Sequence, residues 1–484
     1  MEILYCTFFV GFLGVLGQYD CPYKECFCDQ TDIYCDSQSL KSIPERNVQT
    51  KGFYVTLNLD SNQITTIPAG SLPPNLISLS LQGNPIETID DTAFDESVNT
   101  LQTITFDGAK FTQVPAAVTR LRQLWNLNLY SVNILTWDDN AMKNLCPSLL
   151  SFQLVTGGVS SWPNWLKYCS NLTDISITSS GISSIPDDAL DLVTNTLVQL
   201  QLHNNSLTSV PKAISKMTAL NILSLEQNKI TDLTWLPQLS NLSYLALTEN
   251  RISDAGKLSS VLRPYANTLQ TFSVYDNFLT SIPDLSFLTK IIELDYMNNH
   301  ISDPYSGGIP ENLTSLQLYK NFLTTVPTVM KTMKLLTELD LSYNRMLSIQ
   351  GTDIPNRVTG VDLGNNIITE LTDTSFPVNS NITYLLMSNN PLSKISLLAF
   401  QNLPQLQQLD LTHTKLTRMP LAISLLSKLQ YLDVSGNTGL VCTCLEKGLA
   451  SRISSLPSEA VVGDCGQTSL YVFFTELSHG CPTS

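Results

Sequence analysis

The sequence predicts an α/β solenoid, in which each repeat adds one short strand to a parallel sheet on the concave face. The convex side is expected to consist mostly of irregular or 3-10 turns. Three observations predict this fold. One motif recurs along nearly the whole interior of the 484-residue chain, 43% of the residues are apolar, and most of the cysteines lie at the two ends. Repeats this short bury their apolar side chains only against neighbouring copies, so they must stack.

The repeated motif consists of an apolar residue, two variable residues, an apolar residue, one variable residue, an apolar residue, two variable residues, Asn, one variable residue and an apolar residue. It reads LISLSLQGNPI from Leu76, LNILSLEQNKI from Leu220 and LTELDLSYNRM from Leu336. Seventeen copies run from the one centred on Asn62 to the one centred on Asn437, with a mean spacing of about 23 residues. We number these copies from one to seventeen in chain order.

Each part of the motif has a structural role that follows from its chemistry. The alternating apolar residues predict a short strand with one buried face, and strands of successive copies would stack in parallel. The Asn amide donates and accepts hydrogen bonds, so it can pair backbone groups that the bend after each strand leaves without sheet partners. Ile-Pro and Val-Pro steps, such as Ile67-Pro68 and Val326-Pro327, argue against full helices in most outer turns.

This motif resembles the leucine-rich repeat. From about Cys21 to Cys481 the chain resembles the typical class of extracellular leucine-rich-repeat proteins, which includes Slit, the Nogo receptor, Toll-type receptor ectodomains and the lamprey variable lymphocyte receptors. The resemblance implies a horseshoe of about 17 repeats, with cysteine-rich caps that shield both ends of the core.

The amino terminus begins with an apolar segment from Ile3 to Leu16. At about 14 residues it is too short to cross a bilayer and is typical of a secretory signal peptide. No other stretch reaches membrane length, and the carboxy terminus lacks a lipid-anchor pattern. We therefore expect a secreted, extracellular protein without a transmembrane or lipid anchor. The expected organisation is a signal peptide over 1–17, an amino-terminal cap over 18–53, leucine-rich repeats over 54–440 and a carboxy-terminal cap over 441–484.

Removal of the signal peptide would leave ten cysteines, an even number that is typical of secreted chains. Four lie near the start and four near the end, and spacing alone allows three pairings in each group. The family resemblance implies pairing of the first cysteine with the third and of the second with the fourth. The implied disulfides are Cys21–Cys28, Cys26–Cys35, Cys442–Cys465 and Cys444–Cys481.

The two remaining cysteines, Cys146 and Cys169, each lie three residues before the first apolar position of their copy. The same register in adjacent copies predicts Cα atoms about 5 Å apart, which suits a disulfide. The alternative is a pair of reduced core cysteines. Both lie where four successive copies lack the motif Asn, so we expect a disulfide that reinforces the weakest part of the solenoid. The residues at the Asn position of these copies are Ala109, Val132, Gly157 and Ser180.

Charged residues are scarce, and 42 acids against 27 Lys and Arg give a net charge of −15. This balance disfavours nucleic acid and anionic membranes as partners, because both require a surplus of basic residues. The four histidines are scattered, and no nucleophile, phosphate-loop or zinc motif occurs. We therefore expect no enzymatic activity, no cofactor and no metal.

The third, fifth, seventh and eighth positions of each copy should face the concave surface, and together they hold thirteen acids and one base, Lys320. Tyrosines join these acids in copies nine to thirteen. Three interpretations remain open: a repeat consensus with solvated charges, an anionic groove for a cationic protein or peptide, and calcium held by paired carboxylates. The candidate binding residues are Tyr244, Tyr275, Tyr319, Tyr343, Glu293, Asp295, Glu338 and Asp340.

Five Asn-x-Ser/Thr sequons predict N-glycosylation. Four share one register, so their glycans would crowd one edge and leave the opposite edge and most of the concave sheet open. The fifth lies beside a motif Asn and would cover the rim there. The sequon residues are Asn171, Asn204, Asn241, Asn312 and Asn381.

These patterns favour a secreted binding protein that recognises a protein ligand through its concave face. Three alternatives remain. The protein could be a matrix or adhesion component that self-associates through its outer or edge surface, a soluble non-catalytic partner subunit of a secreted enzyme, or an immune receptor for microbial ligands.

Overall fold

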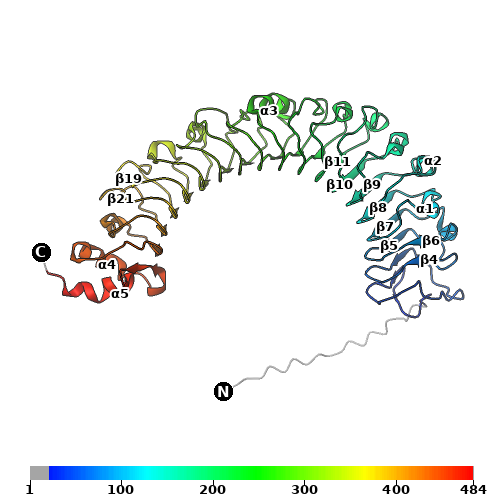
Figure 1. Ribbon diagram of the computed structural model, residues 1–484, viewed down its shortest axis with the longest axis horizontal. Helices are drawn as coiled ribbons and strands as arrows, with labels where there is room; N and C mark the ends of the chain where they lie inside the picture. The colour runs from blue at the N-terminus through cyan, green and yellow to red at the C-terminus, as the bar shows by residue number, and fades with distance from the viewer. Residues whose placement is uncertain (1–20, 483–484) are drawn as a thin grey trace, which may run out of the picture. The chain divides into compact units, whose positions relative to one another are not determined.

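The computed structural model describes residues 21–482, so the expected signal peptide over 1–17 lies outside the described residues. The chain divides into two compact units, Met1–Ser180 and Gly181–Ser484, which are described separately below as unit 1 and unit 2. In each unit the repeat strands lie on one side, and short helices and turns lie on the other (Figure 1).

Unit 1 contains the amino-terminal cysteine-rich segment and copies one to six. It begins with an antiparallel hairpin of β1 (Phe27–Cys28) and β2 (Asp32–Tyr34), and β2 then pairs in parallel with the first repeat strand. The repeat strands are β3 (Thr56–Asn58), β5 (Ser78–Leu81), β7 (Thr103–Asp107), β8 (Asn126–Tyr130), β9 (Ser151–Val155) and β10 (Asp174–Thr178). The outer elements are β4 (Thr66–Ile67), β6 (Thr88–Ile89), α1 (Ala116–Thr119), α2 (Asp139–Met142) and the 3-10 helices η1 (Asp95–Ser97), η2 (Lys143–Leu145) and η3 (Asn164–Tyr168).

Unit 2 contains copies seven to seventeen and the carboxy-terminal cysteine-rich segment. Its strands pair in parallel, but the pairing is interrupted between β14 and β15, which belong to different sheets. The repeat strands are β11 (Gln199–Gln201), β12 (Ile222–Ser224), β13 (Tyr244–Ala246), β14 (Thr271–Ser273), β15 (Glu293–Asp295), β16 (Ser315–Gln317), β17 (Glu338–Asp340), β18 (Gly360–Asp362), β20 (Tyr384–Leu386), β22 (Gln408–Asp410) and β23 (Tyr431–Asp433).

The outer side of unit 2 is built mainly from short 3-10 helices, as the Pro-containing turns predict. The longest helix, α3 (Ala255–Leu262), occupies the outer turn before β14. The other outer elements are β19 (Glu370–Leu371), β21 (Lys394–Ile395) and the 3-10 helices η4 (Asp191–Val193), η5 (Lys212–Lys216), η6 (Arg263–Tyr265), η7 (Thr328–Thr332), η8 (Gly351–Asp353) and η9 (Leu421–Leu425).

The carboxy-terminal segment closes the sheet of unit 2. Its strand β24 (Val461–Val462) pairs in parallel with β23, and Leu449, Leu470 and Phe474 are buried beneath it. The remaining elements of this segment are η10 (Cys444–Leu449), α4 (Ala450–Ile453), η11 (Ser458–Ala460), β25 (Asp464–Cys465), β26 (Thr468–Ser469), α5 (Leu470–Thr475) and η12 (Leu477–Gly480). The repeat strands run from Thr56 to Asp433, and the expected domain boundaries remain a prediction.

The predicted solenoid of seventeen copies is confirmed, because each copy supplies one strand in the described chain. The motif Asn has its predicted role, and Asn321 is representative. Its Nδ2 donates to the carbonyl oxygens of Tyr296 at 2.9 Å and Leu318 at 3.2 Å, and its Oδ1 accepts from the Ile301 amide at 2.9 Å. Each such Asn therefore ties its own bend to the preceding copy.

Copies three to six, which lack the motif Asn, have longer strands. Strands β7 to β10 contain five residues each, whereas the repeat strands of unit 2 contain three. Beyond the strands, the Ile134 amide donates to the Gly157 carbonyl at 3.0 Å, and the Gly157 amide donates to the Ser180 hydroxyl at 3.2 Å. At Ile134 and Gly157, a backbone carbonyl and a hydroxyl group thus accept hydrogen bonds in place of the absent Asn side chains. Low stability of this stretch stays a prediction.

Five disulfides link the cysteines of the described chain, in the expected pairs. Cys146, which follows η2, bonds to Cys169, which follows η3, with their Cα atoms 4.3 Å apart. The other pairs are Cys21–Cys28, Cys26–Cys35, Cys442–Cys465 and Cys444–Cys481.

Candidate functional site

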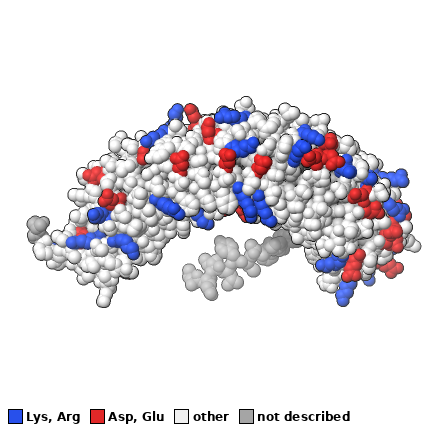
Figure 2. Space-filling view, turned by 45° about the horizontal axis from the view of Figure 1, so that its top comes forward, with Lys and Arg blue, Asp and Glu red and all other residues white. Residues whose placement is uncertain are grey.

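The sheet faces of the two units differ in chemistry. In unit 1, neutral polar side chains pair across neighbouring strands, as in the hydrogen bond from Asn126 Nδ2 to Thr103 Oγ1 at 3.2 Å and that from Tyr130 to Gln153 at 2.6 Å. In unit 2, strands β15, β17, β18, β22 and β23 each contain at least one acidic residue, whereas β16 and β20 contain none. On the face that Figure 2 shows, acidic and basic residues are interspersed among uncharged ones.

The fifth-position aspartates of unit 2 have a structural role in addition to their charge. Each accepts a hydrogen bond from the backbone amide two residues later, and at Asp340 the distance to Ser342 N is 2.9 Å. Such bonds stabilise the bend that ends each strand. Part of the acidic row is thus explained by local structure, as the consensus interpretation proposed. The other aspartates with this contact are Asp295, Asp362, Asp410 and Asp433.

The four predicted tyrosines form two pairs rather than one cluster. Burial followed by the charge of Glu226 raises the pKa of both Tyr244 and Tyr275, and Tyr275 lies close enough to Tyr244 to raise its pKa further. Tyr319 and Tyr343 stack edge to face, with ring centroids 5.0 Å apart. Tyr343 also lines a recess with Lys320 and contributes to a basic surface. A binding role for these four tyrosines stays a prediction.

A tyrosine that the sequence analysis missed lies at the centre of the acidic face. Glu338, Gly360 and Tyr384 occupy the same register on β17, β18 and β20. A Cβ atom at Gly360 would lie 1.9 Å from Cζ of Tyr384, so the tyrosine ring lies directly over the glycine. The ring thereby extends toward Glu338. A glycine at the third position, between a glutamate and a tyrosine, is the sequence signal that could have revealed this arrangement.

The negative charges of this region affect each other's ionisation. Burial, together with the neighbouring charges of Asp340 and Asp410, raises the pKa of Asp362. Burial also raises the pKa of Tyr384 to about 12, with further contributions from Glu338, Asp362 and Asp340. The acidic face therefore concentrates charge that a cationic group would stabilise.

Replacing Gly360 with Ala should displace the Tyr384 ring, because the new methyl group would overlap it. We expect the Tyr384 hydroxyl to leave its acidic surroundings and its pKa to fall. Nitration by tetranitromethane requires the phenolate, so nitration of Tyr384, measured by peptide mapping, should become faster. Tyr305, which is 76% exposed, is the internal control. Unchanged nitration of Tyr384 would show that the glycine does not position the ring.

The calcium interpretation gains no support from the side-chain geometry. In the part of the chain that the structure describes, no group of three or more His, Cys, Asp or Glu side chains is placed to hold a metal ion.

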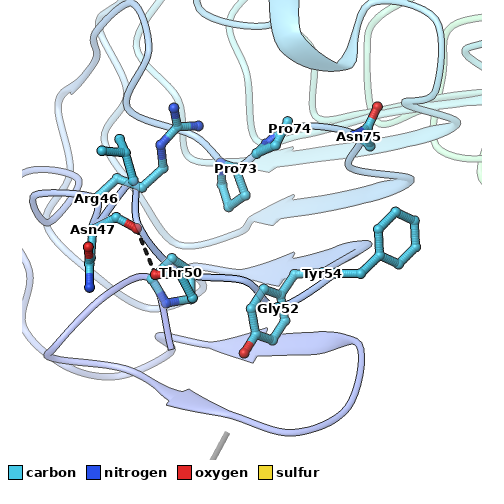
Figure 3. A pocket seen from close by; sticks show the side chains of 11 residues that line it. Arg46, Asn47, Thr50, Gly52, Tyr54, Pro73, Pro74 and Asn75 are labelled. Atoms are coloured by element: carbon cyan, nitrogen blue, oxygen red, sulfur yellow. Dashed lines mark hydrogen bonds between the residues drawn. The ribbon is translucent and has the colours of Figure 1, made fainter. Parts of the chain in front are cut away.

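Another recess lies in the amino-terminal segment of unit 1 (Figure 3). Pro22, Pro73 and Tyr54 contribute to its lining, and Arg46 borders it. The Arg46 guanidinium forms an ion pair with Glu96 at 2.8 Å. The charge of Arg46 is thus neutralised by Glu96 from η1, and we assign no function to the recess.

All five sequon asparagines are exposed. The sequon threonines also have a structural role, since Thr314 donates to the Ile292 carbonyl at 3.1 Å and Thr383 to the Thr359 carbonyl at 3.1 Å. Their recurrence at one edge therefore has a structural explanation besides glycosylation, and occupancy of the sequons stays a prediction.

The family profile described as leucine rich repeat matches residues 170–230, 195–252, 356–416 and 398–438. Each copy within these matches supplies one strand, and its motif Asn position is occupied by a buried Asn, Ser or Thr. The chain is a leucine-rich repeat protein. Its disulfide-bonded terminal segments give this leucine-rich repeat protein the two caps expected from the sequence.

Two relatives of this leucine-rich repeat protein match most of its length. Podocan from Mus musculus is 25% identical over 515 residues and aligns with 95% of this chain and 81% of podocan. Keratocan from Bos taurus is 24% identical over 382 residues, which cover 76% of this chain and 80% of keratocan. These relatives are extracellular matrix proteins without enzymatic function, and this leucine-rich repeat protein is likewise secreted and extracellular. In residues 21–482 no helix combines the length and apolar character needed to cross a membrane.

Among solved structures, Toll in the Toll–Spatzle complex of Drosophila is similar, with a TM-score of 0.57 at 21% identity. The alignment covers 70% of this chain, which spans 48% of the Toll chain. This likeness concerns the fold alone.

Proposed function

We propose that this protein recognises an extracellular protein or peptide that carries basic residues, through the sheet face of copies nine to fifteen. The observation that carries the proposal is the group of carboxylates around Tyr384, formed by Glu338, Asp340 and Asp362. Across the sheet-facing positions of the whole sequence, Lys320 is the one base. Repulsion among these acids is therefore not relieved within the face itself.

A cationic ligand would relieve this repulsion, and the tyrosines would supply contact area. Tyrosine is enriched among the residues that contribute most to binding energy, because its rigid ring covers a large surface and its hydroxyl forms hydrogen bonds. Carboxylates around the ring mainly raise the association rate with a basic partner. The aromatic and acidic residues would thus make separate contributions.

Affinity capture from the extracellular fluid of the source organism tests this proposal. The bait is the whole protein, compared with a variant that carries Glu338→Gln, Asp340→Asn and Asp362→Asn. Asparagine keeps the oxygen that caps each strand end, so the variant should fold like the parent. We expect a basic protein that is retained at low salt by the parent and lost from the variant. Equal retention by both baits would contradict the proposal.

A structural role in the extracellular matrix is the second candidate. Its support is the similarity to podocan and keratocan, which extends over most of this chain. In that case copies of this protein would associate through their outer or edge surfaces. Light scattering would then show assemblies whose size does not depend on Glu338, Asp340 or Asp362.

A further inference from the structure

A stack of side chains crosses four successive copies at the turn edge of unit 2. Phe278, His300, Phe322 and Arg345 each directly follow the motif Asn of copies ten to thirteen. The ring centroids of Phe278 and His300 are 5.0 Å apart, and those of His300 and Phe322 are 5.4 Å apart. The Arg345 guanidinium lies 4.3 Å from the centroid of the Phe322 ring. We refer to these four residues together with Lys320 and Tyr343 as the rim cluster.

The rim cluster is accessible and positively charged. Phe278 and Tyr343 are 42% and 48% exposed, and His300, Lys320 and Arg345 are exposed as well. In the described chain neither Lys320 nor Arg345 takes part in an ion pair.

The recess between these side chains is lined by five members of the rim cluster and by asparagines, and contains no carboxylate. Two unpaired cations beside exposed rings are unusual on a chain with a net charge of −15.

The rim cluster adjoins the acidic sheet face. Tyr319 and Tyr343, in edge-to-face contact, mark the boundary between the two surfaces. Asp340 lies on β17 and Lys320 follows β16, so opposite charges lie within two neighbouring copies. A ligand that crosses the strand ends here would meet negative charge on one side and positive charge on the other.

The positions of the sequons would leave the rim cluster uncovered by glycans. Asn312 is the sequon residue of copy twelve, and it precedes the strand, whereas the rim cluster follows the strand. Asn204, the sequon residue on the turn edge, belongs to copy seven. A glycan at either residue would thus be attached away from the rim cluster.

We propose that the rim cluster accepts an acidic side chain, next to an apolar or aromatic one, from the same protein segment whose basic residues contact the acidic face. This inference rests on the proposed function and adds the orientation of the ligand. The partner segment is dipolar, with its basic end over β17 and β18 and its acidic end at Lys320 and Arg345. Arginine beside aromatic rings is typical of residues that dominate binding energy in protein interfaces.

The surroundings favour a protein segment over a sulfated polysaccharide. A polysaccharide carries negative charge repeatedly along its length and would extend beyond the rim cluster. The adjoining recess, which shares His300, is lined by Glu249 and Asp276. These carboxylates balance Lys229 and Arg251 in the same recess, so it offers a long polyanion no net positive charge, whereas a single acidic side chain would contact only Lys320 and Arg345.

Synthetic peptides and fluorescence anisotropy at low salt test this inference on the whole protein. The probes are oligolysine, oligoglutamate and a two-block peptide in which a lysine block is joined to a block of Glu and Phe. We expect the two-block peptide to bind about ten-fold more tightly than oligolysine, equivalent to one well-placed additional contact. Lys320→Gln with Arg345→Gln should abolish this gain and leave oligolysine binding unchanged.

The matched control is Lys229→Gln with Arg251→Gln, which removes two basic residues at the turn edge beside Glu249. This control variant should still bind the two-block peptide about ten-fold more tightly than oligolysine. The inference is overturned if the two-block peptide binds no better than oligolysine, or if the control removes the gain equally. It is also overturned if dextran sulfate binds more tightly than the two-block peptide and depends on Lys320 and Arg345.

Failure of the proposed function has a different signature in the same assay. In that case oligolysine would bind the Glu338→Gln, Asp340→Asn, Asp362→Asn variant as tightly as the parent. A second outcome is that oligolysine binding depends on those acids, while the Lys320→Gln, Arg345→Gln variant binds the two-block peptide as tightly as the parent. The proposed function then stands, and the inference about the rim cluster is wrong.

Discussion

Loss of the Cys146–Cys169 disulfide should reduce the free energy of unfolding of unit 1 by about 3 kcal/mol, the entropy of closing a loop of this length. The two residues are 23 apart in sequence, and both are buried. Valine at both positions fills a similar volume without the bond, so the double variant Cys146→Val, Cys169→Val isolates the contribution of the bond.

The disulfide also holds an aromatic cluster beneath it. Trp165, from η3, is fully buried, and its ring centroid lies 5.1 Å from that of Phe152 and 5.9 Å from that of Trp137. Without the bond, η2 and η3 would separate more readily and expose this cluster to water. Local opening should therefore become more frequent in copies five and six than elsewhere.

Hydrogen–deuterium exchange, measured amide by amide, shows where along the chain local opening becomes more frequent. Amides of β9 and β10 should exchange faster in the double variant, whereas amides of β16 and β17 in unit 2 serve as the internal control. If exchange in β9 and β10 matches the parent, the longer strands of copies three to six stabilise this stretch without the disulfide. The sequence-based expectation of a weak region would then be wrong.

The fold was predictable from the sequence because its determinants repeat. The buried leucines and the motif Asn recur with one spacing, so each additional copy confirms the others. The longer strands of copies three to six were not predictable in this way. The missing Asn at Val132 or Gly157 shows that one set of hydrogen bonds is absent, but the residue type does not show which backbone groups replace it.

The candidate site was predictable only in part. The positions of the acidic residues followed from the register of the repeat. Their charge alone did not show that Asp340 and Asp362 also accept hydrogen bonds from the backbone amides that follow their strands. The direction of a side chain depends on space left by its neighbours, as at Tyr384 over Gly360. Similarly, Tyr343 follows the strand closely enough to be counted with the concave face, yet its contacts place it with Lys320 at the rim.

The acidic residues and the tyrosines of the sheet face should affect binding kinetics differently. With oligolysine as the probe, Glu338→Gln with Asp340→Asn should slow association and flatten its dependence on salt, because long-range attraction is reduced and salt screens what remains. Asparagine at position 340 preserves the contact with Ser342, so a change in kinetics would reflect charge. The matched control, Asp187→Asn with Asp191→Asn, removes the same charge from outer turns and should leave association unchanged.

Tyr275→Ala should instead act mainly on dissociation. Truncating a contacting aromatic residue costs on the order of 1–3 kcal/mol, and such losses appear chiefly as faster dissociation. Burial and the adjacent acids raise the pKa of Tyr275, so its hydroxyl remains protonated and can donate to a ligand at neutral pH. Stopped-flow measurements at low and high salt separate the two effects. If Tyr275→Ala and the acidic variants all bind like the parent, while substitutions on the outer turns abolish binding, the sheet face is not the binding surface and the matrix role becomes the favoured function.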